Sequence, residues 1–285
     1  MDIVEKISHL QKVLLDWRKE GMTIGLVPTM GAIHDGHLSL VQEAKARCDR
    51  VVATSFINPK QFAPGEDLNS YPRDEVLDKI KFTEAGASLL FYPNVKEIYP
   101  VGHITEVNVK GLSEILEGES RPNFFKGVAT IISKLLILIS PNIAVFGEKD
   151  YQQLCVIRTL VQDLNFLAEI LAMPTIREPD GLAMSSRNTY LSSEERKIAP
   201  FLYQSLCEVS NRVFESDDIE LVCSSARQKL LNCGFNKVDY FVVSNSPTLK
   251  KYFFPSSEIR VLAAVWLGKT RLIDNVQVTF PNKNH

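Results

Sequence analysis

The chain has 285 residues, of which 45% are hydrophobic and 23% are charged, and its formal net charge is −2. These proportions are typical of a globular protein with a sizeable core, and they exclude wholesale disorder and fibrous repeats. The sequence has neither a basic block nor an acidic tail, so we expect no nucleic acid and no membrane surface as principal partner. Its five cysteines are scattered, odd in number and without a CxxC pair, which argues against a disulfide framework or a structural zinc site. We therefore expect a reducing, cytoplasmic location.

The first twelve residues alternate charged and apolar side chains, whereas a signal peptide needs a basic start and an uninterrupted apolar stretch. The most apolar run, 128–139, is too short to span a bilayer and is interrupted by Ser133 and Lys134. This run predicts a buried helix in a soluble protein.

Short β-rich runs alternate with longer helical patterns between residues 23 and 172. The predicted strands are 23–27, 51–57, 88–92, 143–146 and 169–172, and the predicted helices are 37–48, 74–85, 127–139 and 151–164. Such alternation indicates parallel strands with helical crossovers, so we expect a Rossmann-like, doubly wound α/β sheet. Ligands of such sheets bind at the carboxyl ends of the strands.

The alternation stops at the turn-forming residues 178–181, and Ser192 with Glu195 then gives a capping box that opens a helix towards Phe214. A second helix at 219–232 and strands at 238–243, 259–266 and 276–280 follow. This order predicts a smaller α+β domain at the C-terminus. We accordingly expect one domain at 1–177 and a second at 178–285.

The run Pro28-Thr-Met-Gly-Ala-Ile-His-Asp-Gly-His37 stands directly after a predicted strand and directly before a predicted helix. Gly31 and Gly36 allow the backbone to approach a ligand, and the helix N-terminus directs N–H groups at the same place. His34 and His37 can donate hydrogen bonds to phosphate oxygens as negative charge develops. This arrangement predicts a phosphate site. Two alternatives are that the histidines are only surface or capping residues, or that they bind zinc, although their spacing is not the i,i+4 of helical zinc motifs.

Three further segments carry polar side chains suited to the same crevice. Gly147, Glu148, Lys149 and Asp150 follow the strand at 143–146, and Lys149 supplies a compact cation while Asp150 can accept from ribose or from metal-bound water. Ser185, Ser186 and Arg187 suit a polyphosphate. Gln61, after the strand at 51–57, offers a donor and an acceptor. Each segment taken alone is also compatible with an ordinary solvated loop.

Several ordered motifs resemble the pantoate–β-alanine ligase (pantothenate synthetase) family, which is similar to class I aminoacyl-tRNA synthetases and other HxGH nucleotidyltransferases. The motifs are PTMGAIHDGHLSLV from Pro28, INPKQF from Ile57, YPRD from Tyr71, RPNFFKGVAT from Arg121, FGEKDYQQL from Phe146, DGLAMSSRN from Asp180 and TRLIDN from Thr270. The likeness covers nearly the whole chain.

The resemblance implies condensation of pantoate with β-alanine to pantothenate through a pantoyl adenylate, with ATP and Mg²⁺, release of AMP and pyrophosphate, and a homodimer. It implies that residues 1–177 bind ATP and pantoate while 178–285 act as a lid. Catalytic roles fall on His37, His34 and Lys149. The implied ATP-binding residues are Met30, Gly31, Ala32, Ile33, His34, Asp35, Gly36, His37, Gly147, Glu148, Lys149, Asp150, Ile176, Met184, Ser185, Ser186 and Arg187. Gln61 and Gln153 match the pantoate-binding glutamines, and Gln61 also faces β-alanine; no metal ligand is singled out.

Two places depart from the pattern: relatives usually carry a histidine where this chain has Phe124, and an aspartate in the segment where it has Ser244-Asn245-Ser246. A rival interpretation is an HxGH nucleotidyltransferase that acts on a phosphate-bearing acceptor. Such an acceptor would call for arginines where this chain has the neutral amides of Gln61 and Gln153. A nucleotide-sensing protein without turnover is a second rival, and it would need no complete acceptor site.

Overall fold

The structure is a computed structural model that describes residues 1–215, 218–252 and 258–279. The described residues form two compact units. The N-terminal unit comprises Met1–Glu148 and Gln152–Thr175, and the C-terminal unit comprises Lys149–Tyr151 and the described residues from Ile176 onward.

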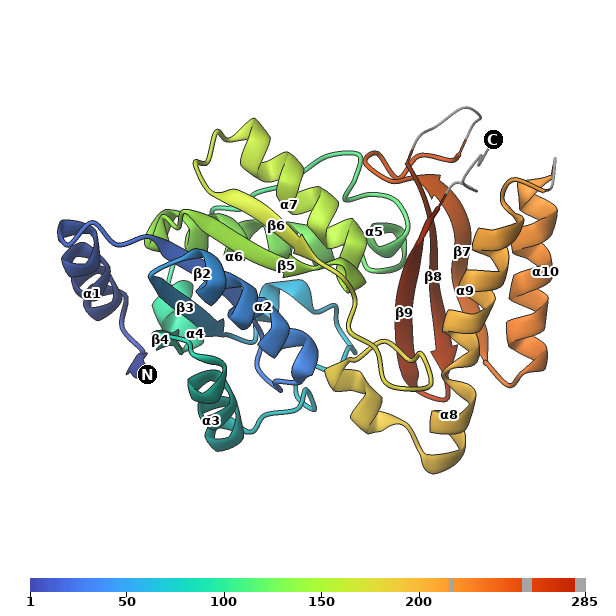
Figure 1. Cartoon of the computed structure of the whole chain (residues 1–285), viewed down its shortest axis with the longest axis horizontal. Coiled ribbons are helices and arrows are strands. Elements are labelled where there is room, and N and C mark those ends of the chain that lie inside the picture. The colour runs from blue at the N-terminus through green and yellow to red at the C-terminus, as the bar shows by residue number, and fades with distance from the viewer. Residues whose placement is uncertain (216–217, 253–257, 280–285) are drawn as a thin grey trace. The chain divides into compact units, whose positions relative to one another are not determined.

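The N-terminal unit is built on a parallel sheet whose strand order, among the described residues, is β1-β4-β3-β2-β5-β6 (Figure 1). The strands are β1 (Asp2–Val4), β2 (Ile24–Thr29), β3 (Arg50–Ser55), β4 (Leu89–Phe91), β5 (Ile143–Gly147) and β6 (Glu169–Met173). The chain leaves β2 towards β3 and β4 on one side and later places β5 on the other side of β2. The carboxyl ends of β2 and β5 therefore form the topological switch point, where doubly wound sheets bind ligands.

Helices connect these strands and cover the sheet. They are α1 (Ile7–Lys19), α2 (Asp35–Arg47), α3 (Glu75–Ala85), α4 (Val95–Ile98), α5 (Glu117–Ser120), α6 (Phe124–Ile139) and α7 (Tyr151–Asp163), with short 3-10 turns η1 (Pro59–Gln61) and η2 (Glu148–Asp150). Helices α2 and α3 pack through Val41 and Phe82 against Val27 and Val145 of the sheet. Helix α6 is mostly buried, as its apolar sequence predicts. Of the helices in the described residues, none combines the length and apolar character needed to cross a membrane.

The C-terminal unit is an antiparallel sheet of order β7-β8-β9 in its described part, packed with helices α9 and α10. The elements are η3 (Ser186–Tyr190), α8 (Ser193–Ile198), α9 (Phe201–Arg212), α10 (Ile219–Asn232), β7 (Lys237–Asn245), β8 (Ile259–Leu267) and β9 (Thr270–Val278). Leu206, Leu230 and Phe241 lie in its core. A Rossmann-like parallel sheet followed by a smaller α+β unit is the predicted fold class, and it is confirmed.

Besides shifts of a few residues at element ends and the short helices α4 and α5, which were not predicted, the structure differs from the predicted elements in three places. Residues 2–19 contain β1 and α1, which were not predicted. The alternating charged and apolar side chains gave no clear periodicity, and β1 is short and is stabilised by pairing with the distant β4. The helix expected from Ser192 to Phe214 is two helices, with Pro200 at the N-cap of α9, because proline lacks the N–H that a helix interior requires. Strand β9 begins at Thr270, earlier than predicted, and Phe280 of the predicted strand lies outside the described residues.

Candidate functional site

The loop after β2 makes a sharp turn before α2. The hydroxyl of Thr29 donates to the carbonyl of Thr54 at 2.6 Å and accepts from the N–H of Gly31 at 3.2 Å. Gly31 has a φ of 88° and Ala32 a φ of 53°, and a Cβ on Gly31 would come within 3.0 Å of the Asp78 carboxylate. Only glycine fits this position without strain.

Asp78 of α3 holds this loop from the side. Its buried carboxylate accepts hydrogen bonds from the N–H groups of Ala32 at 2.9 Å and Ile33 at 2.8 Å. Burial raises the pKa of Asp78, while the two N–H groups act in the opposite direction. Lys81 of the same helix donates to the carbonyl of Ile33. Asp78 was not among the predicted site residues. Its position on the apolar face of α3, with Phe82 and Ala85, indicates a buried carboxylate that must have hydrogen-bond partners.

His34 and His37 lie side by side at the start of α2. Their ring centroids are 4.0 Å apart, and the backbone N–H of His34 donates to Nδ1 of His37 at 3.4 Å. Because a backbone N–H can only donate, Nδ1 of His37 is the accepting nitrogen and the ring proton is on Nε2. The half-buried His37 therefore carries its Nε2–H at a helix N-terminus, where anions are favoured.

Gln61 adjoins this loop from η1, after β3. Its side chain is buried, and its Nε2 lies 2.9 Å from the sulfur of Met30. The structure thus brings a residue of the predicted acid site against a residue of the predicted ATP loop. Asn58 donates a hydrogen bond to Gln61, and Tyr99 donates one to Asn58. The sequence indicated a role for neither residue.

Gln152 and Gln153 differ sharply although they are neighbours in the first turn of α7. Gln152 is buried, accepts from the N–H of Glu117 at 3.0 Å and donates to the carbonyls of Leu112 and Ile115 at 2.7 and 2.8 Å. Gln153 is only half-buried. Gln152 therefore holds the segment that leads into α5, and Gln153 remains the predicted ligand.

Phe124 has a defined partner in Arg121. The Arg121 guanidinium lies 3.9 Å from the centroid of the Phe124 ring and also donates to the carboxylate of Glu66 at 2.6 and 2.7 Å. Its NH2 group also contacts the carbonyl of Gln61 at 3.3 Å. The aromatic ring thus supports an arginine that holds the backbone of Gln61.

The turn after β5 contributes Gly147 and Glu148 to the N-terminal unit and Lys149 and Asp150 to the other. A Cβ on Gly147 would meet no described atom within 4 Å, so the backbone is open to a ligand there. Within the C-terminal unit, Lys149 Nζ lies 3.9 Å from Asp150, and the Lys149 carbonyl accepts from Asn275 at 3.0 Å.

The remaining predicted residues form one closed loop of the C-terminal unit. The carbonyl of Ile176 accepts from the N–H of Met184 at 3.0 Å. Ser185 caps η3, because its hydroxyl accepts from the N–H of Arg187 at 3.3 Å. Ser186 lies between them, half-buried. Hydroxyl and guanidinium groups are thereby gathered within a few residues.

A family model described as pantoate-beta-alanine ligase matches residues 2–277, a span that includes every element of this site. The chain belongs to the pantoate-beta-alanine ligase family.

Relatives of similar length support this membership. A pantothenate synthetase of Rhodospirillum rubrum is 47% identical over 279 residues, which cover 98% of this chain and 99% of the relative. The crystal structure of pantothenate synthetase from Thermus thermophilus superposes with a TM-score of 0.92 at 42% identity, covering 99% of this chain and 100% of that one. The ligase from Francisella tularensis, complexed with beta-gamma ATP and beta-alanine, gives a TM-score of 0.83 at 35% identity, covering 99% of each chain.

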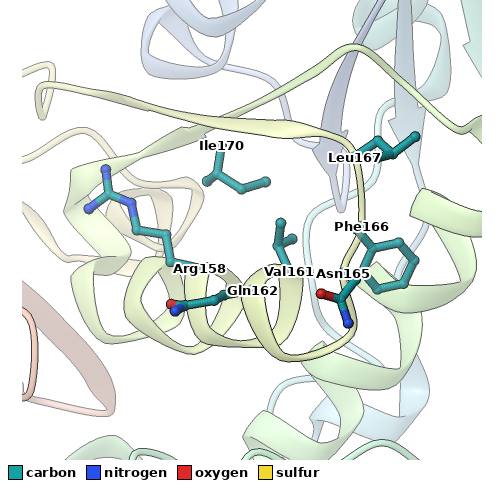
Figure 2. Close-up of a pocket in the computed structure, with 7 residues that line it drawn as sticks. All are labelled: Arg158, Val161, Gln162, Asn165, Phe166, Leu167 and Ile170. Atoms are coloured by element: carbon teal, nitrogen blue, oxygen red, sulfur yellow. The ribbon is translucent and has the colours of Figure 1, made fainter.

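A separate pocket of about 510 Å³ lies at the other end of α7 in this member of the pantoate-beta-alanine ligase family (Figure 2). Its lining residues in the described chain are Arg158, Val161, Gln162, Asn165, Phe166, Leu167 and Ile170, and they include none of the predicted ligands. Because β6 begins at Glu169, the pocket lies near the amino-terminal end of this strand, away from the carboxyl ends of the strands. The candidate site of this ligase is therefore the switch point.

Proposed function

We propose that this ligase condenses pantoate with β-alanine to pantothenate through a pantoyl adenylate, consuming ATP and releasing AMP and pyrophosphate. The observation that carries the proposal is the 2.9 Å contact of Gln61 with Met30 at the switch point. It joins a neutral amide, suited to a polyhydroxy acid, to a loop suited to a nucleotide.

The loop of residues 30–37 would bind the ATP phosphates. Its support comes from the N-terminus of α2, the left-handed turn at Gly31 and the Nε2–H of His37. Gly147, Glu148 and Asp150 would border the nucleotide, and the backbone of Ile176 would face the adenine. Lys149, Met184, Ser185, Ser186 and Arg187 would approach the phosphates. Gln61 and Gln153 would bind pantoate.

The chemistry would need positioning and charge stabilisation. A pantoate carboxylate oxygen would attack the α-phosphorus of ATP, the bond from that phosphorus to the bridging oxygen would break, and pyrophosphate would leave. His34, His37 and Lys149 would stabilise the charge that develops on the leaving group. The free amine of β-alanine would then attack the acyl carbon, form the amide and release AMP with loss of a proton.

We propose Mg²⁺ as the metal that accompanies ATP. Within the described residues, no group of three His, Cys, Asp or Glu side chains is arranged to hold a metal ion. Mg²⁺ is commonly carried by phosphate oxygens and water with few protein ligands, and Asp150 is an exposed carboxylate that could serve as one of them. When bound, the ion would neutralise phosphate charge.

We propose a cytoplasmic homodimer. The five cysteines are all within the described residues and all free, in agreement with a reducing compartment. The dimer rests on family resemblance, and light scattering of the purified protein would measure it directly.

A pyrophosphate exchange assay tests the two-step route. With labelled pyrophosphate, ATP, Mg²⁺ and pantoate but no β-alanine, we expect label to enter ATP, because adenylate formation is reversible. Adding β-alanine should yield pantothenate and AMP in equal amounts. Exchange that proceeds without pantoate, or only with β-alanine, would contradict the pantoyl adenylate. Exchange only with a phosphorylated acceptor would favour the nucleotidyltransferase.

A further inference from the structure

Two buried amides lie next to each other after β3. Asn58 is 1% exposed and Gln61 is 8% exposed, and Nδ2 of Asn58 donates to Oε1 of Gln61 at 3.0 Å. Oxygen and nitrogen of an amide are distinguished by their hydrogen-bond partners. The direction of this cluster therefore depends on what the outer groups can donate or accept.

Backbone groups fix the orientation of Asn58 on both sides. The N–H of Lys60 donates to Oδ1 at 3.2 Å, and Nδ2 donates to the carbonyl of Gly127 at 3.0 Å. A backbone N–H can only donate and a carbonyl can only accept. A flipped Asn58 would oppose like groups at both contacts, so its orientation is determined by the fold.

Gly127 keeps this second contact close. A Cβ on Gly127 would collide with the carbonyl of Lys60, so α6 can approach η1 only with glycine at this position. The carbonyl that orients Asn58 is thereby held against the turn that carries Gln61.

Tyr99 completes the set of donors to Asn58. Its hydroxyl lies 2.9 Å from Oδ1, and because that oxygen accepts, the hydroxyl donates. Burial raises the pKa of Tyr99, so the phenol keeps this proton. The ring is held between Phe56, at 6.1 Å between centroids, and His103, at 5.0 Å.

The consequence reaches Gln61. Its Oε1 is occupied by Asn58, so Nε2 faces Met30 and the candidate site. From the sequence, this glutamine could have offered either a donor or an acceptor. In the folded chain it offers N–H groups, which match an oxygen of a hydroxyl or carboxylate.

We infer that Tyr99 is a positioning residue that acts through Asn58 to present Gln61 as a hydrogen-bond donor to an oxygen of the acid substrate. The inference rests on the proposed function, because it assumes that Gln61 binds pantoate. It assigns to the acid pocket a fixed polarity and to Tyr99 a role without substrate contact.

A double-mutant cycle tests the route through Gln61. Four forms are compared by pantoate-dependent pyrophosphate exchange: the wild type, Tyr99→Phe, Gln61→Ala and the double variant. Tyr99→Phe removes one hydroxyl and keeps the ring, so half-saturating pantoate should rise about threefold to tenfold, the size of one hydrogen bond. Half-saturating ATP should change less than about twofold. In the Gln61→Ala background, the effect of Tyr99→Phe on pantoate should disappear.

Asn58→Asp provides a second variant. Its ionised carboxylate still accepts from Lys60 and Tyr99, but it offers no donor to Gln61 or to the carbonyl of Gly127. The variant therefore loses stability, and Gln61 would turn its Nε2 inward and present an acceptor. The half-saturating concentration of pantoate should rise more than in Tyr99→Phe. In the Gln61→Ala background, Asn58→Asp should leave this concentration unchanged. Tyr92→Phe is the matched control, because the Tyr92 hydroxyl donates to Glu75 at 2.5 Å and not to this cluster.

Each outcome decides one question. Equal effects of Tyr99→Phe with and without Gln61 would overturn the inference, as would an equal rise for ATP and pantoate. Tyr99→Phe without effect on pantoate in a folded protein would do the same. Failure of the proposed function would appear in the wild type itself, as absence of pantoate-dependent exchange.

Discussion

The carboxylate of Asp78 accepts a hydrogen bond of 2.8 Å from the backbone N–H of Ile33, and this bond ties α3 to the loop that carries His34. A second bond of 2.9 Å comes from Ala32, whose left-handed backbone would otherwise be strained. The shape of the predicted phosphate loop is thus held by a residue that follows a different strand.

Asp78→Asn should weaken the use of ATP. An asparagine side chain has one oxygen, so its amide N–H groups would face one of the two backbone donors. Loss of a hydrogen bond to a charged acceptor should raise the half-saturating concentration of ATP by about 10-fold to 100-fold. Asp74→Ala is the control, because Asp74 caps α3 by accepting from Leu77 and should cost only about 1 kcal/mol of stability. An ATP requirement equally raised in both variants would mean that α3 acts through stability alone.

His37→Ala should abolish most pyrophosphate exchange while leaving the fold intact. The Nε2–H of His37 is the donor placed at the N-terminus of α2, and removal of one such donor lowers rates by about 10²- to 10³-fold. The measurement is the exchange rate at saturating ATP and pantoate. His9→Ala, an exposed histidine of α1, should retain the wild-type rate. A rate within twofold of wild type for His37→Ala would remove this histidine from the chemistry.

Gln152→Ala and Gln153→Ala should separate structure from binding. Gln152→Ala leaves the N–H of Glu117 and two carbonyls without their partner, so we expect a loss of about 2–3 kcal/mol in the free energy of unfolding. Gln153→Ala should leave stability within about 0.5 kcal/mol and raise half-saturating pantoate more than half-saturating ATP. Urea denaturation and exchange kinetics measure the two effects. The reverse pattern would exchange the assigned roles.

Phe124→His should lower stability more at acidic than at alkaline pH. A neutral imidazole can still stack on the Arg121 guanidinium, but below a pKa of about 6.5 the ring becomes a cation and repels it. We expect a loss of about 0.5–1 kcal/mol at pH 8 and a larger one at pH 5.5, measured by urea denaturation. Phe124→Leu should show no such pH dependence.

Asp180→Asn should destabilise the C-terminal unit only while the carboxylate is charged. Arg196 donates to Asp180 at 2.6 Å and lowers its pKa, so the pair stabilises the fold above the unfolded-state pKa of about 3.9. Because Asp180 is 42% exposed, the contribution is about 0.5–1 kcal/mol. Denaturation curves should give this difference at pH 7 and 5, and the difference should shrink as pH falls below about 3.9. Glu194→Gln, at an exposed ion pair, should change little.

The sequence alone determined the order along the chain of β2 to β6 and of the helices α2, α3, α6 and α7 between them, because their patterns are local, whereas β1 and α1 were missed. A hydrophobic strand followed by a glycine-containing loop and an apolar-periodic helix predicts the ends of β2 and β5 without knowledge of their neighbours. The same local chemistry indicates which residues suit phosphate. Membership of the pantoate-beta-alanine ligase family follows from the ordered motifs.

Only the tertiary structure decided how these residues are held and which way they face. Asp78 and Ile33 are 45 residues apart, and Tyr99 and Asn58 are 41 apart, so no local pattern joins them. Gln152 and Gln153 are the same residue type and are adjacent in one helix. Only Gln152 is buried, and it has three backbone hydrogen-bond partners. The polarity of Gln61 likewise depends on a carbonyl of α6 and an N–H of η1. Hydrogen bonds have direction, and that direction is set by the groups that packing brings together.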